Sequence, residues 1–245
     1  MNNNIACMKK DNEKKFVRLL KSIASFGVKG HAEEDVIYIE HLYHSMMELD
    51  KESLKTNTAY ADDEEKVERA YCNDVSKEYH CLLKQCNPLG LRIDADDIKH
   101  LFLSKGEQSP WKYPDLVVHL GRNDIEKKNQ MIVVEAKRFS KLTSQSLLDD
   151  LNKLIEFSGE TIWGGNGFKY AVFILVGGSS NQLKTKIDTI FKEENCSLEN
   201  LLNVHTQQIR FRDFVTQYYD RLSRIIIFAH KADKDVESFL LGDIL

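Results

Sequence analysis

The chain has 245 residues and a mass of 28.3 kDa, a length that suits one or two domains. Its 34 Lys and Arg against 38 Asp and Glu give a formal net charge of −4, which disfavours a protein that coats nucleic acid with a basic surface. A hydrophobic fraction of 42%, with only 12 Gly and 3 Pro, excludes low-complexity, collagen-like and linker-dominated chains.

Targeting and membrane signals are lacking in the sequence. No apolar run approaches the ~18 residues of a membrane span, and the N-terminus has no apolar stretch of the kind that secretory signals carry. The five cysteines are odd in number and lack C-x-x-C spacing, which favours free thiols in a reducing compartment. We therefore expect a cytoplasmic protein with no membrane partner.

The first sixty residues carry a helical pattern and no recognisable chemistry. Apolar residues recur at helical spacing over 11–26 and again over 33–49, and a polar connector follows at 51–66. The sequence thus predicts an N-terminal helical segment, 1–60, followed by a single domain, 61–245.

Helices and strands alternate in a mixed order after residue 63. An apolar stripe predicts a helix to about Cys86, because Asn87, Pro88 and Gly90 follow it. Alternating or wholly apolar short segments predict strands, so we expect a small sheet flanked by helices. The expected strands are 91–96, 113–120, 131–137, 169–178, 208–211 and 224–230, and the further expected helices are 146–157, 180–194 and 213–223.

Polar residues stand out on two of the expected strands. Asp115 follows Pro114 at the head of one strand, and Glu135 and Lys137 share a face of the next, because residues two apart in a strand point the same way. An antiparallel hairpin brings Asp115 beside Glu135. Adjacent carboxylates raise a pKa or demand a cation, and such hard oxygen ligands suit Mg²⁺.

A functional site is not the only reading of these residues. Glu-x-Lys at a strand end also suits a solvent-facing edge, and by itself it carries little information. The features that favour a site are Pro114 and Asp115 at the head of the preceding strand, with a helix before and a helix after. In such a site Lys137 would orient or deprotonate the attacking water and offset negative charge on a phosphate.

The segment PDLVVHLGRNDIEKKNQMIVVEAK, residues 114–137, resembles the PD-(D/E)XK nuclease superfamily, which has the restriction-endonuclease-like fold. The order expected over 63–180 is similar to that family's core of helix, three-strand meander, helix and strand. Neighbouring segments look like uncharacterised bacterial and phage-associated members. The resemblance implies an α/β fold with this core behind the N-terminal helical segment. It also implies a hydrolase that cleaves phosphodiester bonds, with DNA as the expected substrate and Mg²⁺ or Mn²⁺ as cofactor.

Individual roles follow from the resemblance by position. Asp115, Glu135 and the backbone carbonyl of Ala136 would bind the metal, and Lys137 would be the catalytic lysine. Members of the superfamily also often carry a glutamate on the first core helix that faces the metal.

Two residues of this chain compete for the helix glutamate. Glu68 is the expected one and Glu78 is the alternative. Ten residues on a helix leave the two side chains about 80° apart around the axis, so only one of them points squarely at the site.

Basic and polar residues after the motif suit contact with a phosphate backbone, although a solvated charged face is an equal alternative. His119 shares the Asp115 face of its strand, where a structural role is the favoured reading. The residues expected at nucleic acid are Arg138, Lys141, Gln145 and Lys153, and Asp150 is a further candidate for positioning substrate.

Two other functions fit the same sequence. A catalytically inactive nuclease-like module would bind nucleic acid or a protein partner, and the charge of −4 favours it slightly. An unrelated structural α/β domain would hold Asp115 and Glu135 more than ~10 Å apart, because ligands of one metal lie about 2 Å from it. The partners expected for the nuclease are nucleic acid and, in a homodimer, a second copy of the chain.

Overall fold

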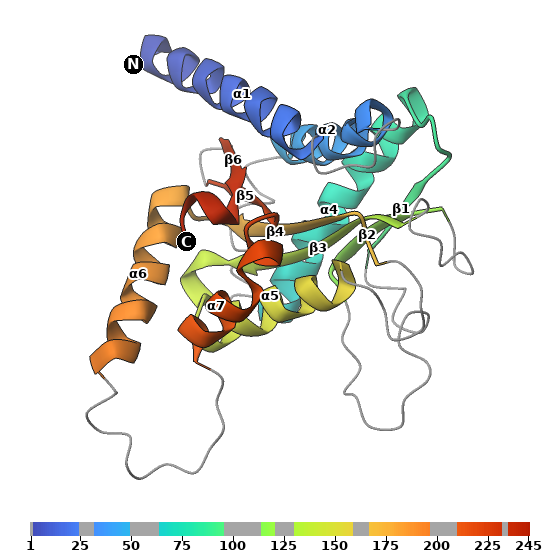
Figure 1. Ribbon diagram of the computed structural model, residues 1–245. Helices are drawn as coiled ribbons and strands as arrows, with labels where there is room; N and C mark the ends of the chain where they lie inside the picture. Colours follow the sequence, from blue (N-terminus) through green and yellow to red (C-terminus); the bar gives the residue numbers. More distant parts are fainter. Residues whose placement is uncertain are drawn as a thin grey trace.

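A six-stranded mixed sheet forms the centre of the computed structural model, with helices on both of its faces (Figure 1). The described residues are 2–24, 32–49, 64–95, 114–120, 130–158, 167–196, 210–231 and 235–245. The strands are β1 (Arg92–Ala95), β2 (Leu116–His119), β3 (Gln130–Arg138), β4 (Tyr170–Val176), β5 (Ile226–His230) and β6 (Val236–Leu240). The helices are α1 (Asn2–Ala24), α2 (Ala32–Glu48), α4 (Glu64–Gln85), α5 (Ser144–Ser158), α6 (Ser180–Cys196) and α7 (Phe211–Leu222), with short 3-10 turns η3 (Phe139–Lys141) and η6 (Leu241–Asp243).

Strand order in the sheet follows chain order, from β1 to β6. The β1–β2, β2–β3 and β5–β6 pairs are antiparallel, whereas β3–β4 and β4–β5 are parallel. Helix α5 provides the crossover between the parallel strands β3 and β4, as such a connection requires. The elements therefore run α4, a meander of β1 to β3, α5 and β4, in the order expected from the sequence.

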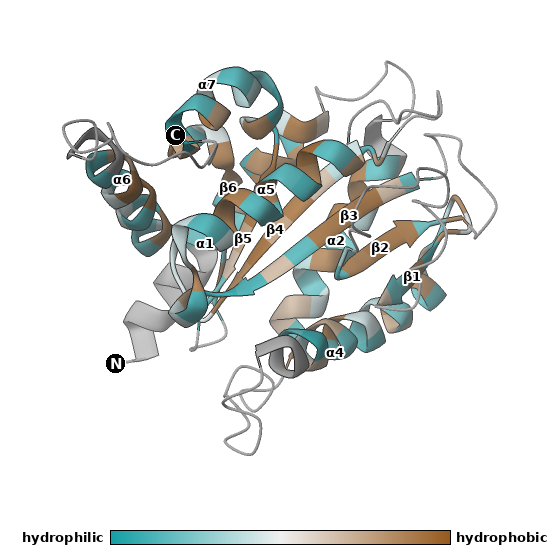
Figure 2. Ribbon diagram, turned by 90° about the horizontal axis from the view of Figure 1, so that it is seen from below, coloured by the Kyte–Doolittle hydropathy of each residue, from teal (hydrophilic) through white to brown (hydrophobic). Residues whose placement is uncertain are grey.

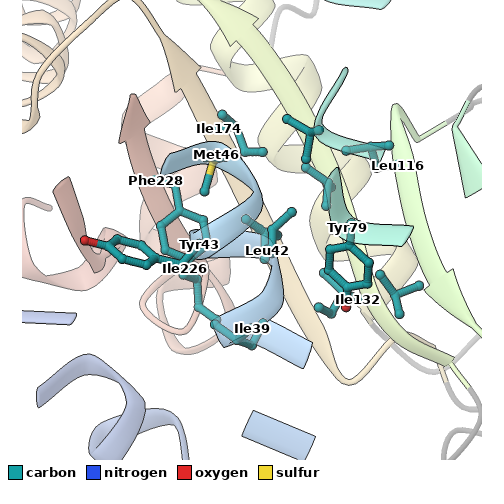
Figure 3. Close-up of a cluster of buried hydrophobic side chains, with 14 of the residues drawn as sticks. Ile39, Leu42, Tyr43, Met46, Tyr79, Leu116, Ile132, Ile174, Ile226 and Phe228 are labelled. Atoms are coloured by element: carbon teal, nitrogen blue, oxygen red, sulfur yellow. The ribbon is translucent and has the colours of Figure 1, made fainter. Parts of the chain in front are cut away.

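Alternation along the strands divides the core into two layers. On β3, Ile132, Val134 and Ala136 join the cluster under α1, α2 and α4, whereas Val133 joins the cluster under α5, α6 and α7. Figure 3 shows part of the first cluster, in which side chains of α2 and α4 meet those of the sheet. Burial of apolar residues on both faces explains why β4 is apolar throughout its length.

The N-terminal helices belong to the first of these layers. Phe16 of α1 stacks on Tyr43 of α2 with ring centroids 3.8 Å apart, and its centroid lies 6.2 Å from that of Phe228 on β5. Helices α1 and α2 thus share one hydrophobic cluster with the central strands.

Two expectations for the C-terminal third were wrong. The strand expected at 208–211 is absent from its described residues, because Arg210 precedes a helix and Phe211 begins α7. Phe211 belongs to the 3-4 spacing that continues with Phe214 and Val215, and all three are buried. Strand β6 was not expected, because Phe239 and Val236 place apolar side chains on both faces and leave no clean alternation.

Other differences concern the ends of elements. Helix α1 begins at Asn2, well before residue 11, and β2 is shorter than the expected strand 113–120 because its ladder begins at Leu116. The connector expected at 51–66 lies outside the described residues, except for 64–66, which begin α4.

The described part of the chain contains no helix that is both long enough and apolar enough to cross a bilayer. Cys72, Cys81 and Cys86 are free thiols, as the sequence predicted for its cysteines. The side chains of the other two cysteines, at 7 and 196, lie outside the described part.

Candidate active site

Asp115 lies directly beside Glu135, at the edge of the β2–β3 ladder. Leu116 pairs with Val134, and the Asp115 N–H donates to the Val134 carbonyl at 3.0 Å. The Asp115 side chain then reaches along β3, where its Oδ2 accepts the Ala136 N–H at 2.7 Å. The two carboxylates therefore occupy neighbouring positions on adjacent strands, as the hairpin argument predicted.

The polar half of β3 faces α5. Because Val133 points toward the α5 layer, alternation places Glu135 and Lys137 on that same face. Figure 2 shows β3 changing from brown to teal toward its C-terminal end, close to α5. A strand buried in the sheet thus brings charged groups into a covered position.

Glu135 is the most deeply buried carboxylate of the site, with only 2% of its surface exposed. Its Oε2 accepts a hydrogen bond from Lys153 Nζ at 2.9 Å, and its Oε1 is buried without a hydrogen-bond partner. Burial raises the pKa of Glu135 well above its ordinary value, Asp115 raises this pKa further, and Lys153 opposes the rise. Glu135 is therefore a strong acceptor whose coordination is incomplete.

Helix α5 adds two charged side chains to the site, Asp150 and Lys153. Residues three apart share a helix face, and Lys153 Nζ lies 3.1 Å from Asp150 Oδ1 as well as within reach of Glu135. Burial alone would lower the pKa of Lys153, but the Glu135 and Asp150 carboxylates raise it above its ordinary value. Burial raises the pKa of Asp150, against the effect of Lys153.

Helix α4, which packs on the opposite face of the sheet from α5, contributes Glu68 to the C-terminal end of β3. Its Oε2 lies 3.3 Å from Lys137 Nζ, and its Oε1 accepts the Arg138 N–H at 3.1 Å. Burial raises the pKa of Glu68, although the Arg138 N–H and Lys137 oppose the rise. Of the two glutamates considered, the structure places Glu68 at the end of β3, while Glu78 lies about 15 Å further along α4.

The pKa of Asp115, which is partly buried, is also subject to opposing effects. Burial raises its pKa to about 6, and the carboxylates of Asp150 and Glu68 add to the rise. The Ala136 N–H and Lys153 pull the pKa the other way. Together the site holds four carboxyl groups and two lysines, so full ionisation leaves an excess of negative charge that a divalent cation would neutralise.

The donor set suits a small hard cation with few protein ligands. Among the described residues, no three His, Cys, Asp or Glu side chains form a group that could hold a metal ion. Mg²⁺, however, is commonly held by one or two carboxylates with waters completing its shell. Asp115 and Glu135 provide such a pair, and the partnerless Oε1 of Glu135 leaves an acceptor for it.

The residues expected at nucleic acid lie in several different environments. Lys153 contacts carboxylates inside the site rather than forming part of an open basic surface. Arg138 is partly buried, and Lys141 is exposed in η3. Gln145 is exposed at the start of α5, where its Nε2 donates to Asp149 Oδ1 at 2.8 Å.

His119 lies away from these carboxylates, at the far end of β2. Its Nε2 is 2.7 Å from Asp94 Oδ2, which also lies 3.0 Å from Arg92 Nε. A bulge between Val118 and His119 accompanies this change of direction. The structure therefore gives His119 a contact with β1, in agreement with the structural role favoured for it.

Sequence reasoning missed the two pairings that organise the site. The hydrogen bonds of Lys153 with Glu135 and of Lys137 with Glu68 cannot be predicted from sequence spacing. Each joins two residues on separate elements that are at least 18 positions apart in the chain. The only sequence signal for the first was the apolar stripe of α5, which leaves Asp150 and Lys153 on neighbouring turns.

Comparison with known proteins adds no assignment. The chain matches no family model, no curated protein and no solved structure. The motif and the geometry of the site are therefore what support a function.

Proposed function

We propose that this chain is a metal-dependent nuclease of the restriction-endonuclease-like type, which hydrolyses phosphodiester bonds and has DNA as its substrate. The observation that carries the proposal is the pairing of Asp115, partly buried at the head of β2, with buried Glu135 of β3, one oxygen of which lacks a hydrogen-bond partner. The order α4, β1 to β3, α5 and β4 supports it, because the resemblance implies a core of that order.

Each residue of the site has a chemical task under this proposal. Asp115, Glu135 and the Ala136 carbonyl would hold Mg²⁺ or Mn²⁺. When bound, such an ion supplies activation of water and charge stabilisation at the phosphate. Lys137 shares the Glu135 face and would hold the attacking water by hydrogen bonding while offsetting phosphate charge.

Glu68 acts through Lys137 and is a positioning residue. It accepts from both the Lys137 ammonium and the Arg138 backbone, which ties the lysine to the end of β3. A lysine whose ammonium is held by a carboxylate that is itself fixed to the neighbouring Arg138 N–H loses little further freedom when substrate binds, which favours a productive geometry.

Cleavage assays test this function directly. We expect wild-type protein to nick supercoiled plasmid or degrade single-stranded DNA with Mg²⁺ or Mn²⁺ and to stop on addition of EDTA. Asp115→Asn, Glu135→Gln and Lys137→Met should each lower the rate by about 10²-fold or more, the usual scale for loss of one charge-stabilising group. RNA substrates in parallel would show which nucleic acid is preferred.

A matched control separates the site from general charge effects. Asp149→Asn changes an exposed carboxylate beside Asp150 and should leave cleavage within about twofold, because surface substitutions of this kind are nearly neutral. Activity that survives Asp115→Asn and Lys137→Met in folded protein would overturn the assignment.

A non-catalytic nuclease-like module is the second candidate, and one contact favours it. The Lys153 ammonium already neutralises Glu135, which is how an acidic site without a metal would be stabilised. Fluorescence anisotropy with labelled DNA distinguishes the two functions: a binding module would bind DNA equally in EDTA and in Mg²⁺ and would leave it intact.

A further inference from the structure

Lys153 makes two ion pairs at the centre of the acidic site. Its Nζ lies 2.9 Å from Glu135 Oε2 and 3.1 Å from Asp150 Oδ1. The lysine comes from α5, whereas Lys137 comes from β3 itself and pairs with Glu68. The two lysines of the site therefore pair with different glutamates, Lys153 with Glu135 and Lys137 with Glu68.

The contact with Glu135 satisfies an otherwise costly buried charge. Only 2% of Glu135 is exposed, and a carboxylate in that position is stable as an anion only beside a positive charge. Lys153 supplies that charge to Oε2, while Oε1 lacks a hydrogen-bond partner. Glu135 is thus half-coordinated, with a monovalent cation on one of its two oxygens.

We propose that the Lys153 ammonium occupies a cation position of the acidic site, so that a divalent ion at the partnerless Oε1 of Glu135 competes with the lysine on Oε2 and binds fully only as the lysine is displaced. This inference rests on the proposed metal-dependent function and names the residue that competes with the metal. Two cations on one carboxylate repel each other, so the lysine weakens metal binding for as long as it stays. Asp150 provides the lysine with a second anchor one turn away on α5, where it remains after displacement.

Calorimetric titration with Mn²⁺ tests the competition, using Lys153→Met against a matched variant. Lys153→Met should bind Mn²⁺ at least about tenfold more tightly than wild type, because a unit charge ~4 Å from a divalent ion is removed. Lys137→Met removes the same charge from the same site without touching Glu135 and should tighten binding by clearly less. Lys184→Met, on exposed α6, should bind as wild type does.

The outcomes separate this inference from the proposed function. Equal tightening in Lys153→Met and Lys137→Met, or none in Lys153→Met, would overturn the competition and leave metal-dependent catalysis standing. Failure of every variant to bind Mn²⁺ through Asp115 and Glu135 would overturn both. Mn²⁺ binding by Lys153→Met and by none of the other proteins would also support the competition, because it would show that the lysine excludes the metal completely.

A second measurement uses the unmodified protein, in case Lys153→Met does not fold. Spectra of ¹³Cε- and ¹⁵Nζ-labelled lysine report each side chain, and Lys153→Arg assigns the Lys153 signal by its loss. Titration with Mg²⁺ should move the Lys153 signal in step with metal binding, while the Lys184 signal stays in place. A Lys153 signal that does not move as Mg²⁺ saturates the site would overturn the inference.

Discussion

Replacing Asp115 by Asn should stabilise the metal-free protein, and it should do so more at high pH. The Asp115 Oδ2 accepts the Ala136 N–H, and the amide oxygen of Asn can accept it equally. What the substitution removes is the negative charge, which the fold disfavours: burial, together with Asp150 and Glu68, raises the pKa of Asp115 from 3.8 to about 6.

The sign follows from proton linkage. A carboxyl group with a raised pKa binds more protons in the folded than in the unfolded chain between about pH 4 and pH 6, so stability falls as pH rises through that window. Above pH 6 the folded protein bears the full free-energy cost of ionising Asp115. The rise in the pKa of Asp115 from 3.8 to about 6 corresponds to about 3 kcal/mol, or about 2 kcal/mol after allowance for solvent screening of a partly buried group. At pH 5 about half of this free-energy cost applies.

Urea denaturation in EDTA measures the effect. Asp115→Asn should exceed wild type by about 2–3 kcal/mol in the free energy of unfolding at pH 8, and by about half as much at pH 5. Asp149→Asn, which changes an exposed carboxylate, should differ from wild type by less than about 0.5 kcal/mol at both values. A gain for Asp115→Asn that is independent of pH, or a loss that grows with pH, would refute the reasoning.

Three further predictions concern the metal and the core. Mg²⁺ at 100 times its Kd should stabilise wild type by about 2.7 kcal/mol and leave Asp115→Asn little changed, as a shift in thermal unfolding would show; equal shifts in both proteins would argue against Asp115 as a ligand. Ile174→Ala, at a fully buried position of β4, should lower the free energy of unfolding by about 2–5 kcal/mol in urea, and a loss under 1 kcal/mol would contradict the packing described. Gly178→Ala should cost about 1–3 kcal/mol in the same assay, because its new methyl group would lie 2.7 Å from Leu175 Cδ2 and 2.8 Å from Phe139 Cβ; unchanged stability would show that both side chains move aside freely.

The long amphipathic and apolar segments could be predicted from the sequence. Helices α2 and α5 and strands β3 and β4 lie within a few residues of their expected ranges, because their period or apolar length is clear. Strand β6 and the start of α7 were not predicted correctly. Each is decided by a neighbour: β6 by its ladder with β5, and Phe211 by packing in the layer of α5 to α7.

The motif residues of the site were also visible in the sequence, and their proximity followed from local rules. Asp115 and Glu135 meet because two consecutive strands pair, and Glu135 and Lys137 share a face because strands alternate. A choice between Glu68 and Glu78 needed the structure, because the rotation of a helix about its axis depends on the surface against which it packs.

Sequence alone thus determined which residues carry charge on the central strands and which strand face they share, since both depend on residue type and a period of two. Only the tertiary structure decided which cation each carboxylate meets. Lys153 and Glu135 are 18 residues apart, and Glu68 and Lys137 are 69 apart, on separate elements. Contacts between elements depend on how helices dock onto the sheet. That docking places an ammonium group on Glu135, where the sequence led us to expect a metal ion.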